Sequence, residues 1–324
     1  MKNSICFIIP YFGDFPSYFD LFLESCKYND GFDWIILTDN KECYNYPKNV
    51  KKIEITFEEC KNFIQNRFKD FTISLDTPKK LCDYKPAYGY IFKDYLKGYG
   101  FWGYCDIDLI FGDLKKFITD DILEQYDRLF SLGHLSLYRN NKDINEMFMR
   151  KINNQYKYKE IYQYKYMCVF DEWSKYSINY IFLENNINIY SKDIIADIAP
   201  YNYSFNLVHF DMKQKIWISD NIKNSIFKWE HGKIIRIWKH KDKIKTKEYM
   251  YLHMQKRKMK NKIKDKEEKN FYIVPNKFIQ FNKKSELYNV NKYKLKTVFD
   301  YKKIKKNIEK INDEIRIKIK KLIK

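Results

Sequence analysis

The chain has 324 residues, of which 45% are hydrophobic and 19% aromatic, and its formal net charge is +19. This composition excludes a disordered chain and provides enough apolar side chains for a large core. The seven cysteines are scattered and show no Cys-x-x-Cys pair, which argues against a disulfide framework or a zinc knuckle. The N-terminal apolar run is too short for a signal peptide, and no stretch approaches the roughly 18 apolar residues of a membrane span. We therefore expect a globular cytoplasmic protein.

The N-terminal part of the chain alternates between predicted strands and helices. Apolar runs predict strands over residues 4–9 and 33–37, and we expect a third strand over residues 50–55. Helical spacing predicts a helix that contains Phe19 and Cys26, and Thr56 begins a second one with a near-capping pattern. This alternation predicts an α/β fold with a Rossmann-like, mostly parallel sheet flanked by helices. Ligands of such sheets bind at the carboxyl ends of the strands, where residues 10–13 and 38–40 are expected.

Two acids, Asp106 and Asp108, follow an apolar aromatic run over residues 101–105 that predicts a buried strand. Residues two apart on an extended strand point to the same side, so the carboxylates are expected together. They repel each other unless a cation lies between them, and Mg²⁺ and Mn²⁺ prefer oxygen ligands. Chance alone can supply such a pair in a charged chain. Its place at the same predicted sheet edge favours a metal site that carries a diphosphate.

The segment before this strand contains two candidate phosphate ligands, Lys80 and Lys85. Pro86 suits the first turn of a helix that is expected to continue over residues 87–96. A lysine at this helix start, together with unpaired backbone N–H groups, could contact a phosphate. Solvated lysines near a helix cap explain the same pattern, and both interpretations stay open.

After the acids, we expect a helix over residues 117–125, a strand over 128–132 and a helix over 169–185. Asp171 and Glu172 fall in the first turn of that last helix, where the helix dipole favours acids in any protein. His134 is either a site residue or a core histidine. Residues 226–229 and 234–238 predict a hairpin with His231 in its turn.

A late histidine, His253, ends the apolar run of residues 249–252 and is followed by Lys256, Arg257 and Lys258. Imidazole can complete the coordination of a Mn²⁺ ion that carboxylates already hold. The cations can neutralise a diphosphate leaving group. An ordinary surface strand followed by a basic loop is the competing interpretation.

The positive charge is concentrated near the C-terminus. Residues 241–324 contain 28 Lys or Arg and 10 Asp or Glu, whereas the preceding 240 residues contain 33 and 32. Over residues 301–324, isoleucines and one leucine recur on one helical face and lysines fill the other. This pattern predicts an amphipathic helix on an anionic membrane surface, in preference to nucleic acid. Packing of that face on the chain itself or on a partner is the alternative.

Several motifs taken together resemble GT-A-type glycosyltransferases, and more closely the glycosyltransferase-like proteins of bacterial capsule and lipopolysaccharide gene clusters. The motifs are Ile-Pro-Tyr-Phe-Gly at residues 9–13, Leu-Thr-Asp-Asn at 37–40, Lys-Pro-Ala-Tyr-Gly at 85–89, Phe-Trp-Gly-Tyr-Cys-Asp-Ile-Asp at 101–108, Gly-His-Leu-Ser-Leu-Tyr-Arg-Asn at 133–140, Phe-Asp-Glu at 170–172 and Leu-His-Met-Gln-Lys-Arg at 252–257. The resemblance implies a GT-A-like catalytic domain over residues 1–260 and a basic extension over 261–324.

The resemblance also implies site residues. Asp106, Asp108 and His253 would bind Mn²⁺ or Mg²⁺, although the Gly and the Lys-Pro-Trp that often follow the histidine in retaining enzymes are absent here. Asp171 and Glu172 match an acidic position that contacts donor sugar or acceptor, and either acid would act as general base in an inverting enzyme. The expected nucleotide-sugar-binding residues are Pro10, Tyr11, Phe12, Asp39, Lys85, Asp106, Lys256 and Arg257.

The implied function is transfer of a sugar from a nucleoside-diphosphate sugar, expected to be a UDP-sugar, to a saccharide acceptor of a cell-surface polysaccharide. The acceptor is expected to be lipid-linked and the enzyme peripheral on the inner face of the cell membrane. Two other classes share parts of the pattern. A nucleotidyltransferase would also use an α/β sheet and a carboxylate pair, and a basic adaptor on membrane or nucleic acid would use only the C-terminal charge.

Overall fold

The computed structural model describes residues 3–174, 176–200, 204–211, 214, 216–222, 224–241, 243–255, 257–265 and 267–282. Internal contacts divide the chain into two compact units, Met1–Ile195 and Ala196–Lys324. Among the described helices, none combines the length and the apolar character that a membrane span requires. The predicted amphipathic helix over residues 301–324 lies outside the described residues.

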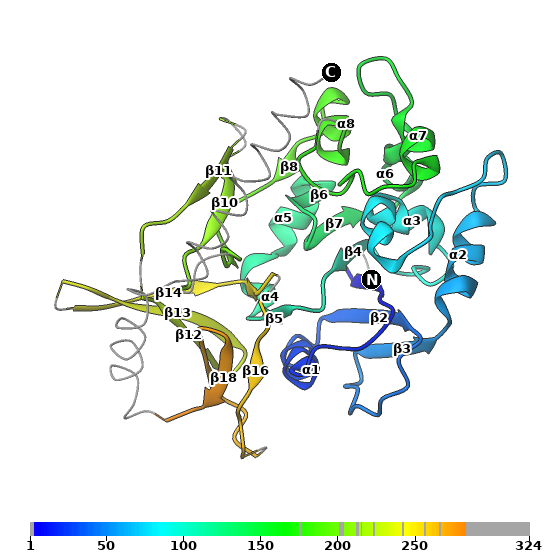
Figure 1. The fold of residues 1–324 in the computed structure, drawn as a ribbon. Helices are drawn as coiled ribbons and strands as arrows, with labels where there is room; N and C mark the ends of the chain where they lie inside the picture. The colour runs from blue at the N-terminus through cyan, green and yellow to red at the C-terminus, as the bar shows by residue number, and fades with distance from the viewer. Residues whose placement is uncertain are drawn as a thin grey trace, which may run out of the picture. The chain divides into compact units, whose positions relative to one another are not determined.

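A seven-stranded sheet with the order β3-β2-β1-β4-β7-β6-β8 forms the centre of the first unit (Figure 1). The parallel pairs are β1–β2, β1–β4, β2–β3 and β6–β8, whereas β7 runs antiparallel to β4 and β6. The prediction of an α/β fold with a largely parallel sheet is therefore confirmed for this unit. Its strands are β1 (Ile5–Pro10), β2 (Phe32–Thr38), β3 (Val50–Glu54), β4 (Phe101–Cys105), β6 (Arg128–Leu132), β7 (Leu135–Arg139) and β8 (Ile189–Tyr190), and β5 (Leu109–Phe111) follows β4 in the chain.

Short helices connect these strands and cover the sheet. They are α1 (Phe19–Lys27), α2 (Phe57–Gln65), the 3₁₀ helix η1 (Pro78–Ala87), α3 (Tyr88–Ile91), α4 (Leu114–Phe117), α5 (Asp120–Gln125), α6 (Lys142–Asn145), the 3₁₀ helix η2 (Met147–Met149), α7 (Lys157–Gln163) and α8 (Ile178–Glu184). Helix α2 begins at a complete capping box, in which Thr56 Oγ1 accepts from the Glu59 backbone N–H and the Glu59 carboxylate accepts from the Thr56 N–H. The sequence prediction of a helix start at Thr56 is confirmed.

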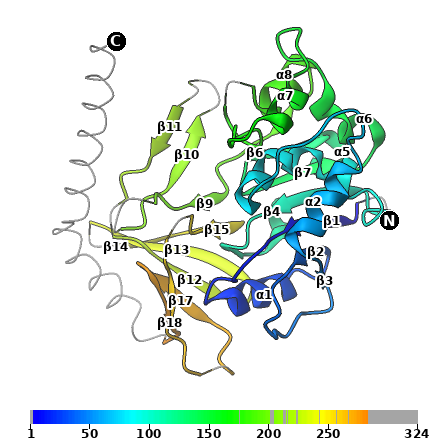
Figure 2. The ribbon, with the colours of Figure 1, turned by 45° about the vertical axis from the view of Figure 1, so that its right-hand side comes forward.

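Alternate residues of the central strands point to opposite faces of the sheet, and other elements cover both faces. On one face, Phe7 stacks on Trp34 with ring centroids 5.5 Å apart, and Phe111 and Phe22 of α1 extend this cluster. On the other face, residues such as Cys6 pack with α2, η1 and α3 in one large core. Figure 2 shows α1 and α2 on opposite sides of β1 and β2. Burial of both faces accounts for the nearly continuous apolar runs of these strands.

Two predicted helices are wrong in extent. Of the helix expected over residues 87–96, only the single turn α3 (Tyr88–Ile91) forms, directly after the 3₁₀ helix η1. Pro86 lies inside η1, where its missing N–H interrupts regular hydrogen bonding. The helix expected over 169–185 begins only at Ile178. Val169 has a φ of 58°, and the N–H of Phe170 is bound by the Asp83 carboxylate. Tertiary contacts therefore use the backbone groups that a helix would need.

The second unit contains a six-stranded sheet with the order β14-β13-β12-β17-β18-β16. Its neighbouring strands pair antiparallel, except that β16 and β18 are parallel. The predicted hairpin is confirmed, with His231 (φ 48°) and Gly232 (φ 74°) in its turn. The strands of the unit are β9 (Ile195–Asp197), β10 (Val208–Asp211), β11 (Ile216–Ser219), β12 (Ile226–Glu230), β13 (Lys233–His240), β14 (Lys243–Tyr249), β15 (Tyr251–His253), β16 (Lys260–Asn261), β17 (Phe271–Val274) and β18 (Lys277–Gln280).

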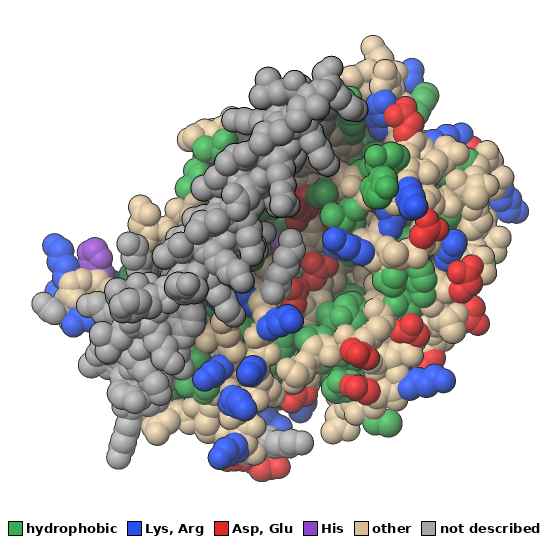
Figure 3. Space-filling model, in the orientation of Figure 1, with side chains coloured by type: hydrophobic (Ala, Val, Ile, Leu, Met, Phe, Trp, Pro, Cys, Tyr) green, Lys and Arg blue, Asp and Glu red, His purple; other side chains and the backbone are tan. Residues whose placement is uncertain are grey.

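The boundary expected at residue 260 does not coincide with the division between the two units. Strand β17 lies beyond residue 260 and pairs with β12, which lies before it, so that boundary cuts through one sheet. Figure 3 shows Lys and Arg side chains close together over β16 and β18. The exposed lysines of this region are Lys258, Lys260, Lys262, Lys264, Lys269 and Lys277. Part of the basic C-terminal charge is thus carried by a folded sheet.

Candidate active site

Three polar segments meet at one edge of the first unit's sheet, as the sequence predicts. Strands β1, β2 and β4 are parallel, so their carboxyl ends, at Pro10, Thr38 and Cys105, lie at the same edge. The N–H of Tyr11 donates to the carbonyl of Leu37 at 2.9 Å and holds the first two ends together. This edge is where ligands bind in open α/β sheets.

The acidic pair lies in the turn between β4 and β5, and not on the strand itself. Asp106 directly follows Cys105, and its N–H donates to the backbone carbonyl of His134 at 2.9 Å. The same-side argument from strand geometry therefore does not apply. Both carboxylates nevertheless affect Tyr11. Burial raises the pKa of Tyr11 most, and the charges of Asp108, Asp14 and Asp106 raise it further. A carboxylate oxygen of Asp106 and one of Asp108 lie within 4.8 Å of each other.

The loop after β1 is held by its own hydrogen bonds. Gly13 has a φ of 98°, and its N–H donates to Asp39 Oδ1 at 2.8 Å. The Tyr11 ring stacks on Phe15 at 5.3 Å, and Phe12 meets Phe57 edge to face at the same distance. Asp39 therefore contributes to the shape of this loop, and its contact with a nucleotide stays a prediction.

Lys85 connects the acidic turn to the segment that carries Asp171. From η1, its Nζ donates to Asp106 Oδ1 and to the carbonyl of Gly133, both at 2.7 Å, and lies 3.4 Å from Asp171 Oδ2. Burial lowers the pKa of Lys85, but Asp106 and Asp171 outweigh it and hold that pKa well above its usual value. Lys85 therefore stays charged between the two carboxylates. Lys80, the other lysine considered from the sequence, is buried and paired with Asp83.

Asp171 and Glu172 pack against Gly133 from a turn that is not part of a helix. Glu172 Oε1 accepts from the Gly133 N–H at 3.2 Å. A Cβ at position 133 would lie 2.6 Å from Asp171 Oδ2, so only glycine permits this approach. The Asp171 side chain is 5% exposed and that of Asp106 is 38% exposed. Burial, offset by Lys85 and reinforced by Glu172 and Asp106, raises the pKa of Asp171 to about 7.

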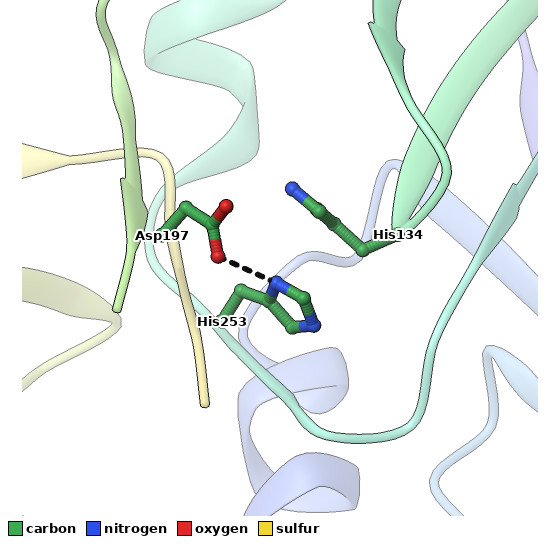
Figure 4. Close-up of side chains that lie close together, drawn as sticks. All are labelled: His134, Asp197 and His253. Carbon is green, nitrogen blue, oxygen red and sulfur yellow. Dashed lines mark hydrogen bonds and ion pairs between the residues drawn. The ribbon is translucent and has the colours of Figure 1, made fainter. Parts of the chain in front are cut away.

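In the second unit, His253 is oriented by an acid that the sequence analysis missed. His253 Nδ1 lies 2.8 Å from Asp197 Oδ1, as Figure 4 shows, and Gln255 Nε2 donates to the same oxygen at 2.7 Å. A carboxylate on Nδ1 is the usual partner of a histidine that binds metal through Nε2. Asp197 interrupts the apolar run Ile194–Ile198, and a charged residue inside a buried strand was the available signal.

Arg257, one of the basic residues that follow His253, is buried within the second unit. The guanidinium of Arg257 is buried over the Phe205 ring and donates to the carbonyls of Ala199 at 2.9 Å and Ser204 at 3.1 Å. These contacts hold a loop within the second unit, and donor binding by Arg257 stays a prediction. Lys256 lies outside the described residues.

Comparisons with known proteins identify a family but no activity. A model of a family of unknown function, DUF6625, matches residues 7–282. No curated protein matches the chain. Among solved structures, galactosyltransferase LgtC with donor and acceptor sugar analogues has a TM-score of 0.34, and an active-site mutant of LgtC has 0.33. Each is 12% identical and covers 61% of this chain and 76% of its own. Similarity at this level establishes neither activity nor substrate.

Proposed function

This chain belongs to the DUF6625 family of unknown function, and we propose that it is a metal-dependent glycosyltransferase that uses a nucleoside-diphosphate sugar as donor. The observation that carries the proposal is the position of Lys85, which joins Asp106 at the open sheet edge to the buried Asp171. The Lys85 ammonium group lies between the partly exposed carboxylate of Asp106 and the buried carboxylate of Asp171. This arrangement suits a site in which a charged diphosphate lies beside a neutral sugar. The sequence motifs support a UDP-sugar.

We propose that Asp106, Asp108 and His253 bind Mn²⁺ or Mg²⁺. Carboxylate oxygens suit both ions, and the Asp197-oriented imidazole of His253 suits Mn²⁺ better. When bound, the metal would stabilise charge on the departing nucleoside diphosphate. The support for the carboxylates is their common effect on Tyr11, and the support for His253 is its hydrogen bond to Asp197.

The chain's own residues would do the remaining work. Lys85 would contribute a fixed positive charge beside the diphosphate, and Pro10, Tyr11, Phe12 and Asp39 would form the wall next to the nucleotide. Asp171 or Glu172 would contact the donor sugar or the acceptor hydroxyl. Since burial raises the pKa of Asp171 to about 7, this carboxyl can accept a proton near neutral pH, as an inverting reaction would require. Lys256 and Arg257 would contribute further positive charge near the diphosphate.

The acceptor and the location belong to the same proposal. A saccharide of a capsule or lipopolysaccharide, attached to lipid, would be the acceptor, and the protein would be peripheral on the inner face of the cell membrane. The support comes from the sequence, in which lysines and isoleucines alternate between the two faces of a predicted helix over residues 301–324.

A screen of nucleotide sugars with Mn²⁺, scored by released nucleoside diphosphate, tests this function. We expect slow hydrolysis of one donor, and loss of both hydrolysis and Mn²⁺-dependent UDP binding in Asp106→Asn and Asp108→Asn. Asp113→Asn is the matched control, because Asp113 is a nearby acid that caps α4, a role that Asn also fills. Unchanged UDP binding in both variants would refute the proposal. Pyrophosphate release from a nucleoside triphosphate would favour a nucleotidyltransferase instead.

A further inference from the structure

A buried ion pair on η1 holds the segment that precedes Asp171. The side chains of Lys80 and Asp83 are 4% and 0% exposed, and Lys80 Nζ donates to Asp83 Oδ2 at 2.7 Å. The same ammonium group donates to the carbonyls of Ile161 at 3.0 Å and Tyr166 at 2.7 Å. All three of its protons are therefore bound, two of them by the backbone of another segment.

Asp83 holds the next turn of that segment by two backbone N–H groups. Cys168 N donates to Asp83 Oδ2 at 2.8 Å, and Phe170 N donates to Asp83 Oδ1 at 3.0 Å. Val169 lies between them with a φ of 58°, a conformation that is strained for a β-branched residue. A strained residue persists only where its surroundings over-determine it, and here the Asp83 carboxylate supplies that constraint.

The constrained turn leads directly into the acids of the candidate site. Asp171 follows Phe170 and reaches Lys85, which lies on η1 two residues after Asp83. Resting on the function proposed above, we propose that Lys80 and Asp83 are positioning residues that fix Asp171 and Glu172 relative to Lys85. The ion pair acts on the reaction through these two acids and does not touch the substrate itself.

The double variant Lys80→Met/Asp83→Asn tests whether the ion pair holds this turn. Removing both charges avoids the buried unpaired charge that either single variant would leave. Alkylation by iodoacetamide, followed peptide by peptide, compares Cys168 in the turn with the exposed Cys43. Burial raises the pKa of the Cys168 thiol, which is half-buried, so release of the turn exposes the thiol further and is expected to accelerate its labelling about tenfold. Unchanged labelling of Cys168 in the folded double variant overturns the proposal.

Additivity of the kinetic effects tests whether the ion pair acts through the acids. A small displacement of a reacting group costs up to about a hundredfold in turnover, so the double variant should lower kcat by one to two orders of magnitude, with little change in donor KM. In an Asp171→Asn/Glu172→Gln background the same change should cost less than about threefold, because the groups it positions are gone. A full loss in that background overturns the proposal.

A control variant and the separate readouts keep the two proposals distinguishable. Asp127→Asn removes an ion pair with Arg139 elsewhere in the first unit. It should leave Cys168 labelling unchanged, and its effect on kcat should be the same in both backgrounds. If the wild-type protein hydrolyses no nucleotide sugar, the proposed function fails, whereas the labelling experiment still decides whether Lys80 and Asp83 hold the turn.

Discussion

Replacing Asp171 by Asn should stabilise the protein at alkaline pH while it lowers activity. The carboxyl is almost fully buried, and burial raises its pKa from 3.8 to about 7, although Lys85 opposes that change. In the unfolded chain the pKa returns to its ordinary value. Above pH 7 the folded protein must therefore keep a carboxylate that is less stable in its native surroundings than in water. An amide of nearly the same shape removes this cost.

The direction of the pH dependence follows from the two pKa values. Between about pH 4 and pH 7 the folded state binds the proton more tightly than the unfolded state, so the free energy of unfolding falls as pH rises through this window. The full difference corresponds to roughly 4 kcal/mol above pH 7. At pH 4.5, where the folded carboxyl is neutral, the variant should be more stable by only about 1 kcal/mol. At pH 8 the variant should be more stable by roughly 4 kcal/mol.

Urea unfolding in the presence of EDTA, at pH 4.5 and at pH 8, measures this difference without a contribution from bound metal. Asp127→Asn serves as control, since its partly exposed ion pair should give no stabilisation at either pH. Equal free energies of unfolding for the wild type and Asp171→Asn at pH 8 would show that Asp171 is not held in a high-pKa environment. The proposed proton acceptor near neutral pH would then be lost as well.

Three further substitutions separate structural from functional roles. Gly133→Ala would place a Cβ 2.6 Å from Asp171 Oδ2, and we expect a loss of about 1–3 kcal/mol in thermal unfolding together with reduced turnover. Thr56→Ala removes the capping box of α2 and should cost about 1 kcal/mol with no change in UDP binding measured by calorimetry. Arg257→Met should cost roughly 2–3 kcal/mol through its lost bonds to two carbonyls, whereas a stable variant with weakened UDP binding would support a donor role instead.

The sequence by itself determined the first half of the sheet and the edge where the candidate site lies. Continuous apolar runs predicted β1 and β2, because strands buried on both faces carry few polar residues. Spacing of period 3.6 predicted α1, because a helix buries only one side of its regular backbone. Parallel strands bring their carboxyl ends together, so Tyr11, Asp39 and Asp106 could be assigned to one edge without coordinates. The acidic pair was also recognisable, although its turn was not.

Only the tertiary structure decided the surroundings of Asp171 and the partner of His253. Residues 169–177 contain enough apolar residues to predict a helix, but Asp83 binds two N–H groups of the preceding turn and holds Val169 at a positive φ. Asp197 lies 56 residues before His253, and only the pairing of β9 with β15 brings the two together. Both arrangements depend on buried contacts between distant segments. Such contacts override local propensity and leave no periodic signal in the sequence.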